Sequence, residues 1–423
     1  MRFTRRAAVA VVGVAALLAA SACGSSDGSS GGGSGSKKVE VFTWWADGGE
    51  KAGLDGLVAQ FGKDCAGQEF VNGAVAGGAG ANAKNVLASR LQQSDPPDTF
   101  QAHAGAELQD YIKAGQVEDL SADYDTWGLK TAFPAGLIQN LTVDGKIYSV
   151  PANIHRANVV WTNKKVVADA GITDDPKDMA SFIADLDKLK AKGIKTPLAV
   201  GKDWTMLMLL ESVLITDLGA DKFTGLWNGT TDWNGADVTK GINDFKTLLT
   251  YTNTDRDALD WTDAEKLVMD GKAAYQLMGD WEAADMDAKK FADYGWFTFP
   301  GNGDTYQWLA DSFVLPKGAK NVDGTKCWLK TVGSADGQKA FNTKKGSIPA
   351  RIDASPADYP KYQQAAMADW KTFKQVPSCA HGSGCSQGFQ GAANSALGAF
   401  STNQDVAGLQ KAMATAASQF AAK

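Results

Sequence analysis

The chain has 423 residues, with 42 Lys and Arg against 48 Asp and Glu, and a formal net charge of −6 at pH 7. This composition argues against nucleic acid as a partner, because phosphate binding needs a basic surface and the sequence holds no basic run or basic aromatic stripe. A chain of this length exceeds what one compact core usually serves, which indicates two lobes.

Residues 1–22 have the layout of an export signal. Three arginines precede an uncharged run at 7–20, which small residues and Cys23 follow. The run is shorter than the roughly 20 apolar residues that a transmembrane helix needs. Cleavage before Cys23 is therefore predicted. The pair Arg5 and Arg6 leaves a twin-arginine export route open.

The sequence around Cys23 predicts a membrane anchor. The residues ASAC at 20–23 resemble a bacterial lipobox, in which the Cys thiol is acylated and becomes the new N-terminus. Residues 24–36 contain only Gly, Ser and one Asp, a composition typical of a flexible tether. We expect a lipidated Cys23, a tether over 23–37 and an extracytoplasmic protein held at the outer face of the cell membrane. A secreted protein with a chance Cys is the alternative.

A strand, loop and helix order begins after the tether and repeats. Strands are predicted at 39–44, 69–75 and 98–101, and helices at 51–63, 81–92 and 106–113. In the first of these helices, apolar residues recur at the spacing of one helix face, at Leu54, Leu57, Val58 and Phe61. Such alternation predicts α/β units around a mostly parallel sheet.

A second alternating series follows a tight turn predicted at 143–146. Its strands are expected at 159–162, 197–200, 273–278, 296–299 and 308–315, and its helices at 178–192, 204–218, 237–250 and 263–270. We expect lobe 1 to comprise 38–150 with about 310–350, and lobe 2 to comprise about 151–309 with 351–423. The chain would then cross between the lobes several times.

Tryptophans gather with polar residues in loops beside the predicted strands. The chain holds 13 Trp, among them Trp44 and Trp45 before Glu50, and Trp281 directly after Asp280. Ligands of open α/β sheets bind outside the carboxyl ends of the strands. An indole stacks on the apolar face of a pyranose, and the sugar hydroxyls need donors and acceptors. These loops predict a sugar pocket, with core packing as the alternative for any single Trp.

Metal binding and catalysis have less support. His103, His155 and His381 fall in separate predicted loops without metal-ligand spacing, which favours hydrogen bonding to a polar ligand. The sequence lacks a nucleophile elbow, a zinc-protease motif, a Walker loop and a dinucleotide fingerprint. Glu50 and Asp311 leave a glycosidase carboxylate pair as the enzyme alternative. We expect no metal, no cofactor and no enzymatic activity.

Four cysteines remain beyond Cys23. An exported protein meets an oxidising environment, so disulfides are predicted for an even count. Cys379 and Cys385 enclose only five residues, which favours a local bridge and leaves Cys65 for Cys327. All three pairings remain open, and a zinc site is the competing interpretation.

Several segments, taken in order, carry a resemblance to a known family. They are VFTWW (41–45) with Glu50, FQAHAGAEL (100–108), VPANIHRAN (150–158), MGDW (278–281), DSFVLPKG (311–318), KGSIPAR (345–351) and AHG (380–382). Together they resemble the family 1 extracellular solute-binding proteins of carbohydrate ABC importers, most closely the glucose/mannose-type branch.

The resemblance implies a type II periplasmic-binding-protein fold, with two α/β lobes that close about a hinge on one sugar and dock on a membrane permease. It suggests stacking by Trp45 and Trp281, with Trp44 and Trp261 as further aromatic candidates. Hydroxyl contacts would come from Glu50, Gln101, His103, Asp311, Lys345 and His381. Asn153, His155 and Arg156 resemble support beside the hinge.

The ligand that the resemblance implies is a monosaccharide such as glucose, galactose or mannose. A short oligosaccharide is the alternative, and a secreted glycoside hydrolase is a more distant one. The expected partners are the sugar, the transmembrane subunits of the permease and the membrane through the lipid anchor. We expect a monomer.

Overall fold

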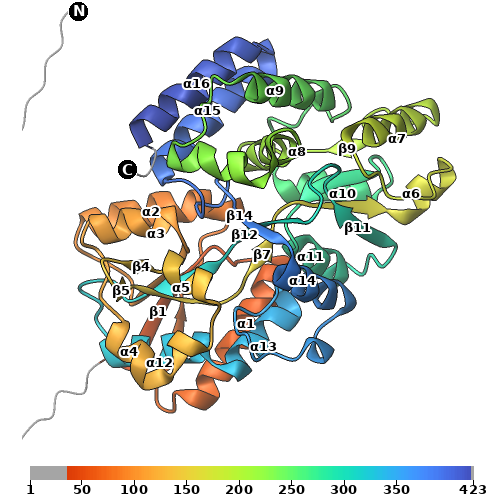
Figure 1. The fold of residues 1–423 in the computed structure, drawn as a ribbon. Helices are drawn as coiled ribbons and strands as arrows, with labels where there is room; N and C mark the ends of the chain where they lie inside the picture. The colour runs from red at the N-terminus through yellow and green to blue at the C-terminus, as the bar shows by residue number, and fades with distance from the viewer. Residues whose placement is uncertain (1–35, 421–423) are drawn as a thin grey trace, which may run out of the picture. The chain divides into compact units, whose positions relative to one another are not determined.

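The computed structural model describes residues 36–420, which form helices packed around β-sheets (Figure 1). The predicted signal peptide, the lipidation site Cys23 and the tether up to residue 35 lie outside these residues. Within 36–420, no helix combines the length and the apolar character that crossing a membrane requires.

The first sheet has five strands in the order β2-β1-β3-β13-β6. These strands are β1 (Lys38–Phe42), β2 (Glu69–Asn72), β3 (Thr99–His103), β6 (Ser149–Pro151) and β13 (Asp311–Val314). Its helices are α1 (Gly48–Asp64), α2 (Ala81–Gln92), α3 (Ala106–Lys113), α4 (Ser121–Trp127), α5 (Ala135–Asn140), α12 (Val322–Gly333) and α13 (Ala335–Lys345). Short elements complete it: η1 (Gly78–Gly80), η2 (Leu129–Thr131), β4 (Thr142–Val143) and β5 (Lys146–Ile147). We call this part the first lobe.

The second sheet has four strands in the order β11-β8-β10-β9. They are β8 (Val159–Asn163), β9 (Leu198–Ala199), β10 (Tyr275–Met278) and β11 (Tyr294–Thr298). Its helices are α6 (Lys164–Asp169), α7 (Met179–Ala191), α8 (Trp204–Asn228), α9 (Ala236–Leu249), α10 (Trp261–Met269), α11 (Trp281–Ala288), α15 (Gln387–Asn403) and α16 (Val406–Phe420). Figure 1 shows α9 and α15 beside α8, with α16 packed against α9 and α15. We call this part the second lobe.

A small third sheet connects the lobes. It consists of β7 (His155–Arg156), β12 (Thr305–Leu309) and β14 (Lys374–Pro377) in the order β14-β12-β7. The chain runs from β6 through β7 into the second lobe, and it returns from β12 through Ala310 to β13. A third connection begins after α13 and continues through η3 (Pro356–Asp358) and α14 (Lys361–Thr372). In this connection Ile348 pairs with Ile154. Several crossovers therefore join the lobes, as predicted.

The two-lobed α/β architecture is confirmed, but the sheets are mixed where mostly parallel strands were expected. β1 pairs parallel with β2 and β3, whereas β13 is antiparallel to both β3 and β6. In the second sheet, β8 is antiparallel to β10 and β11. β13 and β8 enter their sheets directly from the small connecting sheet, without a helix before them. A strand that arrives in this way need not run parallel to its neighbours. The residue boundaries proposed for the lobes stay a prediction.

Most predicted helices and strands lie within two or three residues of the observed ones. The segment at 308–315 is an exception, because β12 ends at Leu309 and β13 begins at Asp311. The two strands belong to different sheets, so the turn at Ala310 places Asp311 at the boundary between the lobes.

Both predicted disulfides are confirmed. Cys65 at the end of α1 pairs with Cys327 of α12, with a Cα–Cα distance of 6.0 Å, and Cys379 pairs with Cys385 at 4.8 Å. Both distances fall in the usual range for a disulfide. The first bridge joins two helices of the first lobe, and the second closes the loop between β14 and α15.

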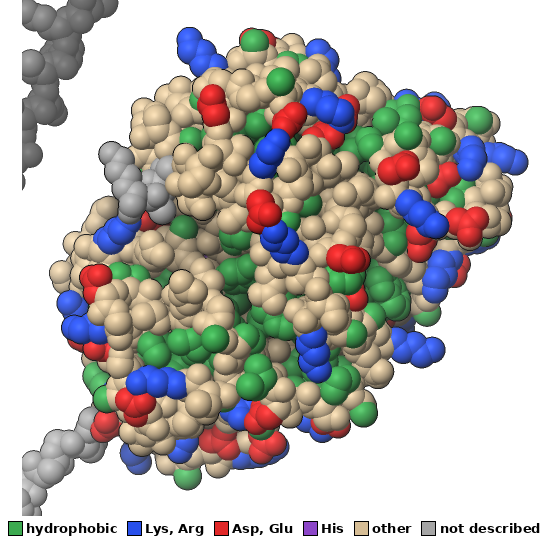
Figure 2. Space-filling view, viewed as in Figure 1, with side chains coloured by type: hydrophobic (Ala, Val, Ile, Leu, Met, Phe, Trp, Pro, Cys, Tyr) green, Lys and Arg blue, Asp and Glu red, His purple; other side chains and the backbone are tan. Residues whose placement is uncertain are grey.

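Charged side chains of both signs are interspersed on the face shown in Figure 2, and no histidine is visible there. All three histidines are buried, with at most 2% of each residue exposed. Buried polar side chains need partners, so the surroundings of the histidines identify the candidate site.

Candidate functional site

A cavity lies between the lobes, where the sheet ends of the first lobe face helix N-termini of the second. Its lining residues are Trp44, Glu50, Ala79, His103, His155, Trp204, Trp261, Trp281, Leu309, Asp311, Lys345 and His381. The cavity volume is about 20 Å³, which is room for roughly one water molecule. Binding of anything larger therefore requires these walls to move apart.

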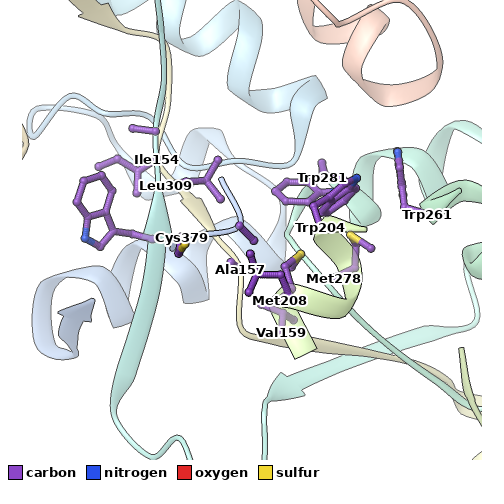
Figure 3. Packing of buried hydrophobic residues seen from close by; sticks show 14 of the residues in the cluster. Ile154, Ala157, Val159, Trp204, Met208, Trp261, Met278, Trp281, Leu309 and Cys379 are labelled. Carbon is purple, nitrogen blue, oxygen red and sulfur yellow. The ribbon is translucent and has the colours of Figure 1, made fainter. Parts of the chain in front are cut away.

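Three indoles from the second lobe form one side of the cavity, which we call the aromatic wall. Trp204, Trp261 and Trp281 are the first residues of α8, α10 and α11. The Trp204 and Trp281 rings lie 6.0 Å apart, centroid to centroid, and are tilted by 56°. Figure 3 shows Trp204 and Trp281 close together, with Trp261 on a neighbouring helix. A Trp at a helix start projects from a fixed backbone position, so the wall is held by three helices.

Four residues of the first lobe form the opposite side, which we call the polar wall. They are Glu50 of α1, His103 at the end of β3, Asp311 at the start of β13 and Lys345 at the end of α13. The wall thus contains two carboxyl groups, an imidazole and an ammonium group.

Asp311 is the centre of the polar wall. Its Oδ1 accepts a hydrogen bond from Gln101 Nε2 at 2.8 Å, and its Oδ2 accepts one from Asn153 Nδ2 at 2.7 Å. His155 Nε2 lies 3.3 Å from Oδ2, and His103 Nε2 lies 3.7 Å from Oδ1. Burial by itself would raise the pKa of Asp311, but His155, His103 and Lys345 outweigh burial and lower it. Asp311 is therefore a buried carboxylate that stays ionised.

A second carboxylate orients His103. Its Nδ1 lies 2.9 Å from Oε2 of Glu107, which also accepts a hydrogen bond from Lys84 Nζ at 2.8 Å. Burial would raise the pKa of Glu107, but Lys84 and His103 lower it to about 2. An ionised Glu107 can only accept, so Nδ1 of His103 carries the hydrogen and Nε2 is directed to the cavity and Asp311.

His155 is fixed in the same way. Its Nδ1 is hydrogen-bonded to Asp280, the residue before α11. Burial would lower the pKa of His155, but the charge of Asp280 and the hydrogen bonds with Asp280 and Asp311 together outweigh burial and raise it. The ring also packs edge-on against Trp281 at 5.0 Å. His155 thus links the polar wall to the aromatic wall.

An ion pair spans the edge of the cavity. Lys345 Nζ lies 3.0 Å from Glu50 Oε1 and 5.5 Å from the Trp281 ring centroid. Burial raises the pKa of Glu50, an effect that Lys345 partly offsets. Lys345 therefore presents its charge to a carboxylate and to an indole face at once.

His381 closes the cavity from the loop between β14 and α15. Its ring lies 5.2 Å from that of Trp281 and 5.3 Å from that of Trp204. Among the described residues, its Nε2 has no hydrogen-bond partner although it is buried. A ligand polar atom at this position would satisfy it.

The structure brings together eight of the ten residues predicted for the ligand site. They are Trp44, Glu50, His103, Trp261, Trp281, Asp311, Lys345 and His381. Gln101 lies behind the cavity, where it holds Asp311 and accepts a hydrogen bond from Thr43. Trp45 does not line the cavity either. It is fully buried, with its ring 4.6 Å from Phe341 and 5.5 Å from Phe313.

Sequence reasoning missed Trp204 as a lining residue and placed His155 only in a supporting role. Trp204 begins a long, mostly apolar helix, in which a core position is the usual interpretation of a Trp. A signal was present, because Trp204, Trp261 and Trp281 each directly follow an Asp at a helix start. An Asp is a preferred residue before a helix, but the pair alone does not identify these positions, because Asp232-Trp233 lies in a turn and Asp369-Trp370 lies inside α14.

The arrangement can stack on an apolar ring face and hydrogen-bond to a rim of hydroxyls. Indole faces and charged donors and acceptors meet in one buried space, where charge-assisted hydrogen bonds are stronger than in water. Across residues 36–420, His, Cys, Asp and Glu form no group of three arranged to hold a metal ion.

Known proteins resemble this chain along most of its length. Residues 45–339 match the family described as bacterial extracellular solute-binding protein. The chain is 35% identical over 380 residues to an uncharacterized ABC transporter extracellular-binding protein of Pyrococcus horikoshii, which covers 88% of this chain and 85% of the relative. It is 31% identical over 342 residues to a probable sugar-binding periplasmic protein of Mesorhizobium japonicum, which covers 79% of this chain and 81% of that protein.

A solved structure shares the fold. A chitin oligosaccharide binding protein superposes with a TM-score of 0.79 at 22% identity, over 91% of this chain and 99% of the other. At this identity the likeness concerns the two-lobed fold alone.

Proposed function

We propose a sugar-binding function for this chain, which belongs to the bacterial extracellular solute-binding proteins. One observation carries the proposal, namely that three indoles face two carboxyl groups, an ammonium group and three imidazoles in one cavity between two lobes. A pyranose needs this combination of apolar face and hydrogen-bonding rim. A relative is named as a probable sugar-binding protein, which supports the same class of ligand.

The proposed ligand is a monosaccharide such as glucose, galactose or mannose. Ten of the twelve lining residues are buried, Glu50 and Ala79 being the partly exposed ones. An oligosaccharide needs an opening through which its further units extend. One sugar ring requires a smaller displacement of the two walls than several rings do, so we propose a monosaccharide, with a short oligosaccharide as the alternative.

The proposed role is delivery of this sugar to an ABC permease outside the cytoplasm. The family is extracellular, and one relative is named as part of an ABC transporter. Acylation of Cys23 would hold the protein at the outer face of the membrane, and residues 24–36 would let a monomer reach the permease.

The hydrogen bonds and stacking that the cavity residues would offer to a sugar account for a typical affinity. A Kd of about 1 μM corresponds to about −8 kcal/mol. Hydrogen bonds to charged groups contribute about 1.5–3 kcal/mol each. A few such bonds with Asp311, Lys345 or Glu50, together with stacking on Trp281, reach that range even after ordering costs.

Titration calorimetry tests the proposal with glucose, galactose, mannose, xylose and short oligosaccharides of each. We expect one monosaccharide to bind with a Kd near or below about 10 μM. Binding only to oligosaccharides would overturn the ligand size, and no binding across the panel would overturn the sugar-binding function.

One observation favours a glycosidase as a second candidate. The pKa of Glu50 is raised by burial and that of Asp311 is lowered by its histidines, and opposite shifts of two carboxyl groups are typical of an acid and base pair. Incubation with aryl glycosides separates the two functions. Turnover that disappears in Glu50→Gln would favour the enzyme, and we expect none.

A further inference from the structure

We propose that Glu211, a residue of α8 outside the cavity lining, determines through Ser378 whether His381 offers the ligand a hydrogen-bond donor or an acceptor. The hydrogen-bonded relay from Glu211 through Ser378 to His381 rests on its geometry, and the pH at which it switches rests on the burial of Glu211. The meaning of the relay for a sugar rests on the proposed function.

Glu211 has no exposed surface, and its carboxyl group accepts hydrogen bonds from the loop at residues 378–386. One oxygen accepts from the backbone N–H of Cys379. The other accepts from Ser378 Oγ at 3.0 Å and more distantly from the backbone N–H of Ala380 at 3.4 Å. Gln307 of β12 is a further polar side chain facing this group. Glu211 therefore positions the loop that carries His381.

Ser378 connects Glu211 to the imidazole. Its Oγ lies 2.9 Å from Nδ1 of His381 and 3.0 Å from Glu211. A hydroxyl has one hydrogen to donate. When Ser378 donates to an ionised Glu211, it can only accept from His381, so the hydrogen of the ring is on Nδ1. Nε2 then presents a lone pair to the cavity.

Protonation of Glu211 reverses this direction. A neutral carboxylic acid donates its O–H to Ser378, and the Ser378 hydrogen turns to Nδ1 of His381. The neutral ring must then carry its hydrogen on Nε2, which becomes a donor. His381 holds one hydrogen in both forms, and the proton that differs between them belongs to Glu211.

The surroundings of Glu211 determine the pH at which the relay changes direction. Burial raises the pKa of Glu211 to about 8, although the hydrogen bonds from Cys379, Ser378 and Ala380 lower it. Burial also keeps the pKa of His381 well below its usual value, so the ring stays neutral.

Four charged or titratable groups on neighbouring elements affect the pKa of His381. His103 of β3, His155 of β7 and Lys84 of α2 lower the pKa of His381, and Asp311 of β13 opposes them. Asp311 and Glu107 stay ionised in this range, but the pKa of His155 is also raised, so the variant Glu211→Gln is needed to assign a step near pH 8 to Glu211.

Nitrogen NMR of the ¹⁵N-labelled protein without sugar tests the relay. The His381 signals are assigned by their loss in His381→Gln. We expect the ring to change from the Nε2–H to the Nδ1–H tautomer as the pH rises through about 8, while it stays neutral. A single tautomer from about pH 6 to pH 9.5 would overturn the proposal.

Matched variants locate the cause. Glu211→Gln keeps the acceptor for the Cys379 N–H and donates its amide to Ser378, with loss of only the long contact from the Ala380 N–H. The Nε2–H tautomer should therefore persist at every pH. Ser378→Ala should also abolish the pH step. Ser383→Ala, a buried serine of the same loop outside the relay, should leave the step unchanged. A step that survives in Glu211→Gln or Ser378→Ala would overturn the relay, and thermal unfolding checks that each variant is folded.

Sugar binding gives an independent readout. With the monosaccharide found by calorimetry, wild type and Glu211→Gln should agree within about twofold at pH 6.5 and differ by at least about threefold at pH 9. Equal affinities at both pH values would overturn the effect on the ligand. A chain that binds no sugar but shows the tautomer step would contradict the proposed function and leave the relay standing.

Discussion

The two walls of the cavity are built in different ways. The polar wall belongs to the first lobe, and its central Asp311 is held by Gln101 and Asn153, so the carboxylate is fixed before a ligand arrives. The aromatic wall belongs to the second lobe, and its indoles rest on ring contacts such as the 6.0 Å pair of Trp204 and Trp281. Hydrogen bonds fix direction and ring contacts tolerate displacement, so the first lobe is suited to orient a ligand and the second to cover it.

The largest expected effect comes from breaking the polar wall with Asp311→Asn. The new amide group would direct a donor at the amide of Gln101 or Asn153, and it removes the charge that His155 and His103 face. We expect sugar affinity to fall by at least about 100-fold, since charged hydrogen bonds contribute about 1.5–3 kcal/mol each. Calorimetry measures this loss, with Asp55→Asn on the exposed face of α1 as the control. Unchanged affinity would mean that Asp311 only supports the fold.

Truncation of the aromatic wall should have a smaller effect. Trp281→Ala removes an indole that contacts His155, His381 and Trp204, and we expect affinity to fall at least about tenfold, or 1.4 kcal/mol. The matched variant Trp328→Ala removes a fully buried ring of the first-lobe core. It should cost about 3–5 kcal/mol of stability and leave the affinity of the folded protein nearly unchanged. The reverse pattern would assign Trp281 to the core.

The support of the aromatic wall should respond to pH. Next to Trp281, Glu282 is fully buried, and neither of its carboxyl oxygens has a hydrogen-bond partner among the described residues. Burial, with Glu265 and Asp285, raises the pKa of Glu282. The folded protein then keeps a proton that the unfolded chain releases above about pH 4.3. The free energy of unfolding should therefore fall by up to about 1.4 kcal/mol per pH unit as pH rises.

Glu282→Gln removes this titration. Its stability should equal or exceed that of wild type at pH 8, and the difference should shrink towards pH 5, as urea unfolding at several pH values will measure. Glu69→Gln at an exposed position of β2 is the control and should follow wild type. A difference that does not vary with pH would show that packing, and not charge, is responsible.

The smallest effect on affinity is expected for Trp45→Phe. The resemblance suggests that Trp45 stacks on the sugar, but its ring is buried between Phe313 and Phe341 behind the polar wall. We expect affinity to change by less than about threefold, under 1 kcal/mol. Calorimetry decides, and a tenfold loss would favour the stacking role.

Adjacent Trp residues illustrate what sequence reasoning can resolve. It placed Trp44 and Trp45 in one loop beside a strand, which is correct. One indole of the pair faces the cavity and the other faces the core, in an irregular segment where Ala46 N–H donates to the Trp44 carbonyl. Nothing in the residue types distinguishes them.

The same limit applies to strand direction and to long helices. Apolar patterning predicted one strand over 308–315, which contains β13, but neither its division at Ala310 nor the antiparallel direction of β13 between β3 and β6. Direction depends on the element from which the chain arrives. Glu211 was not singled out by sequence reasoning. The residues around it in its apolar helix do not indicate that its carboxyl group binds a loop more than 160 residues away in sequence. Asp311, His103 and Lys345 were found because the loops and segments around them resemble a family.

The position of β13 also has a consequence for the order in which the chain can fold. The first lobe needs β13, α12 and α13, which lie late in the sequence, and Cys65 pairs with a cysteine 262 residues further on. Until that part of the chain has emerged, β3 has an unpaired edge where β13 will bind, and such edges promote aggregation. The lobe that begins first is therefore completed nearly last. An N-terminal fragment would not fold as an independent unit. A chaperone that binds unfolded chains would be most useful before the chain has emerged as far as residue 345.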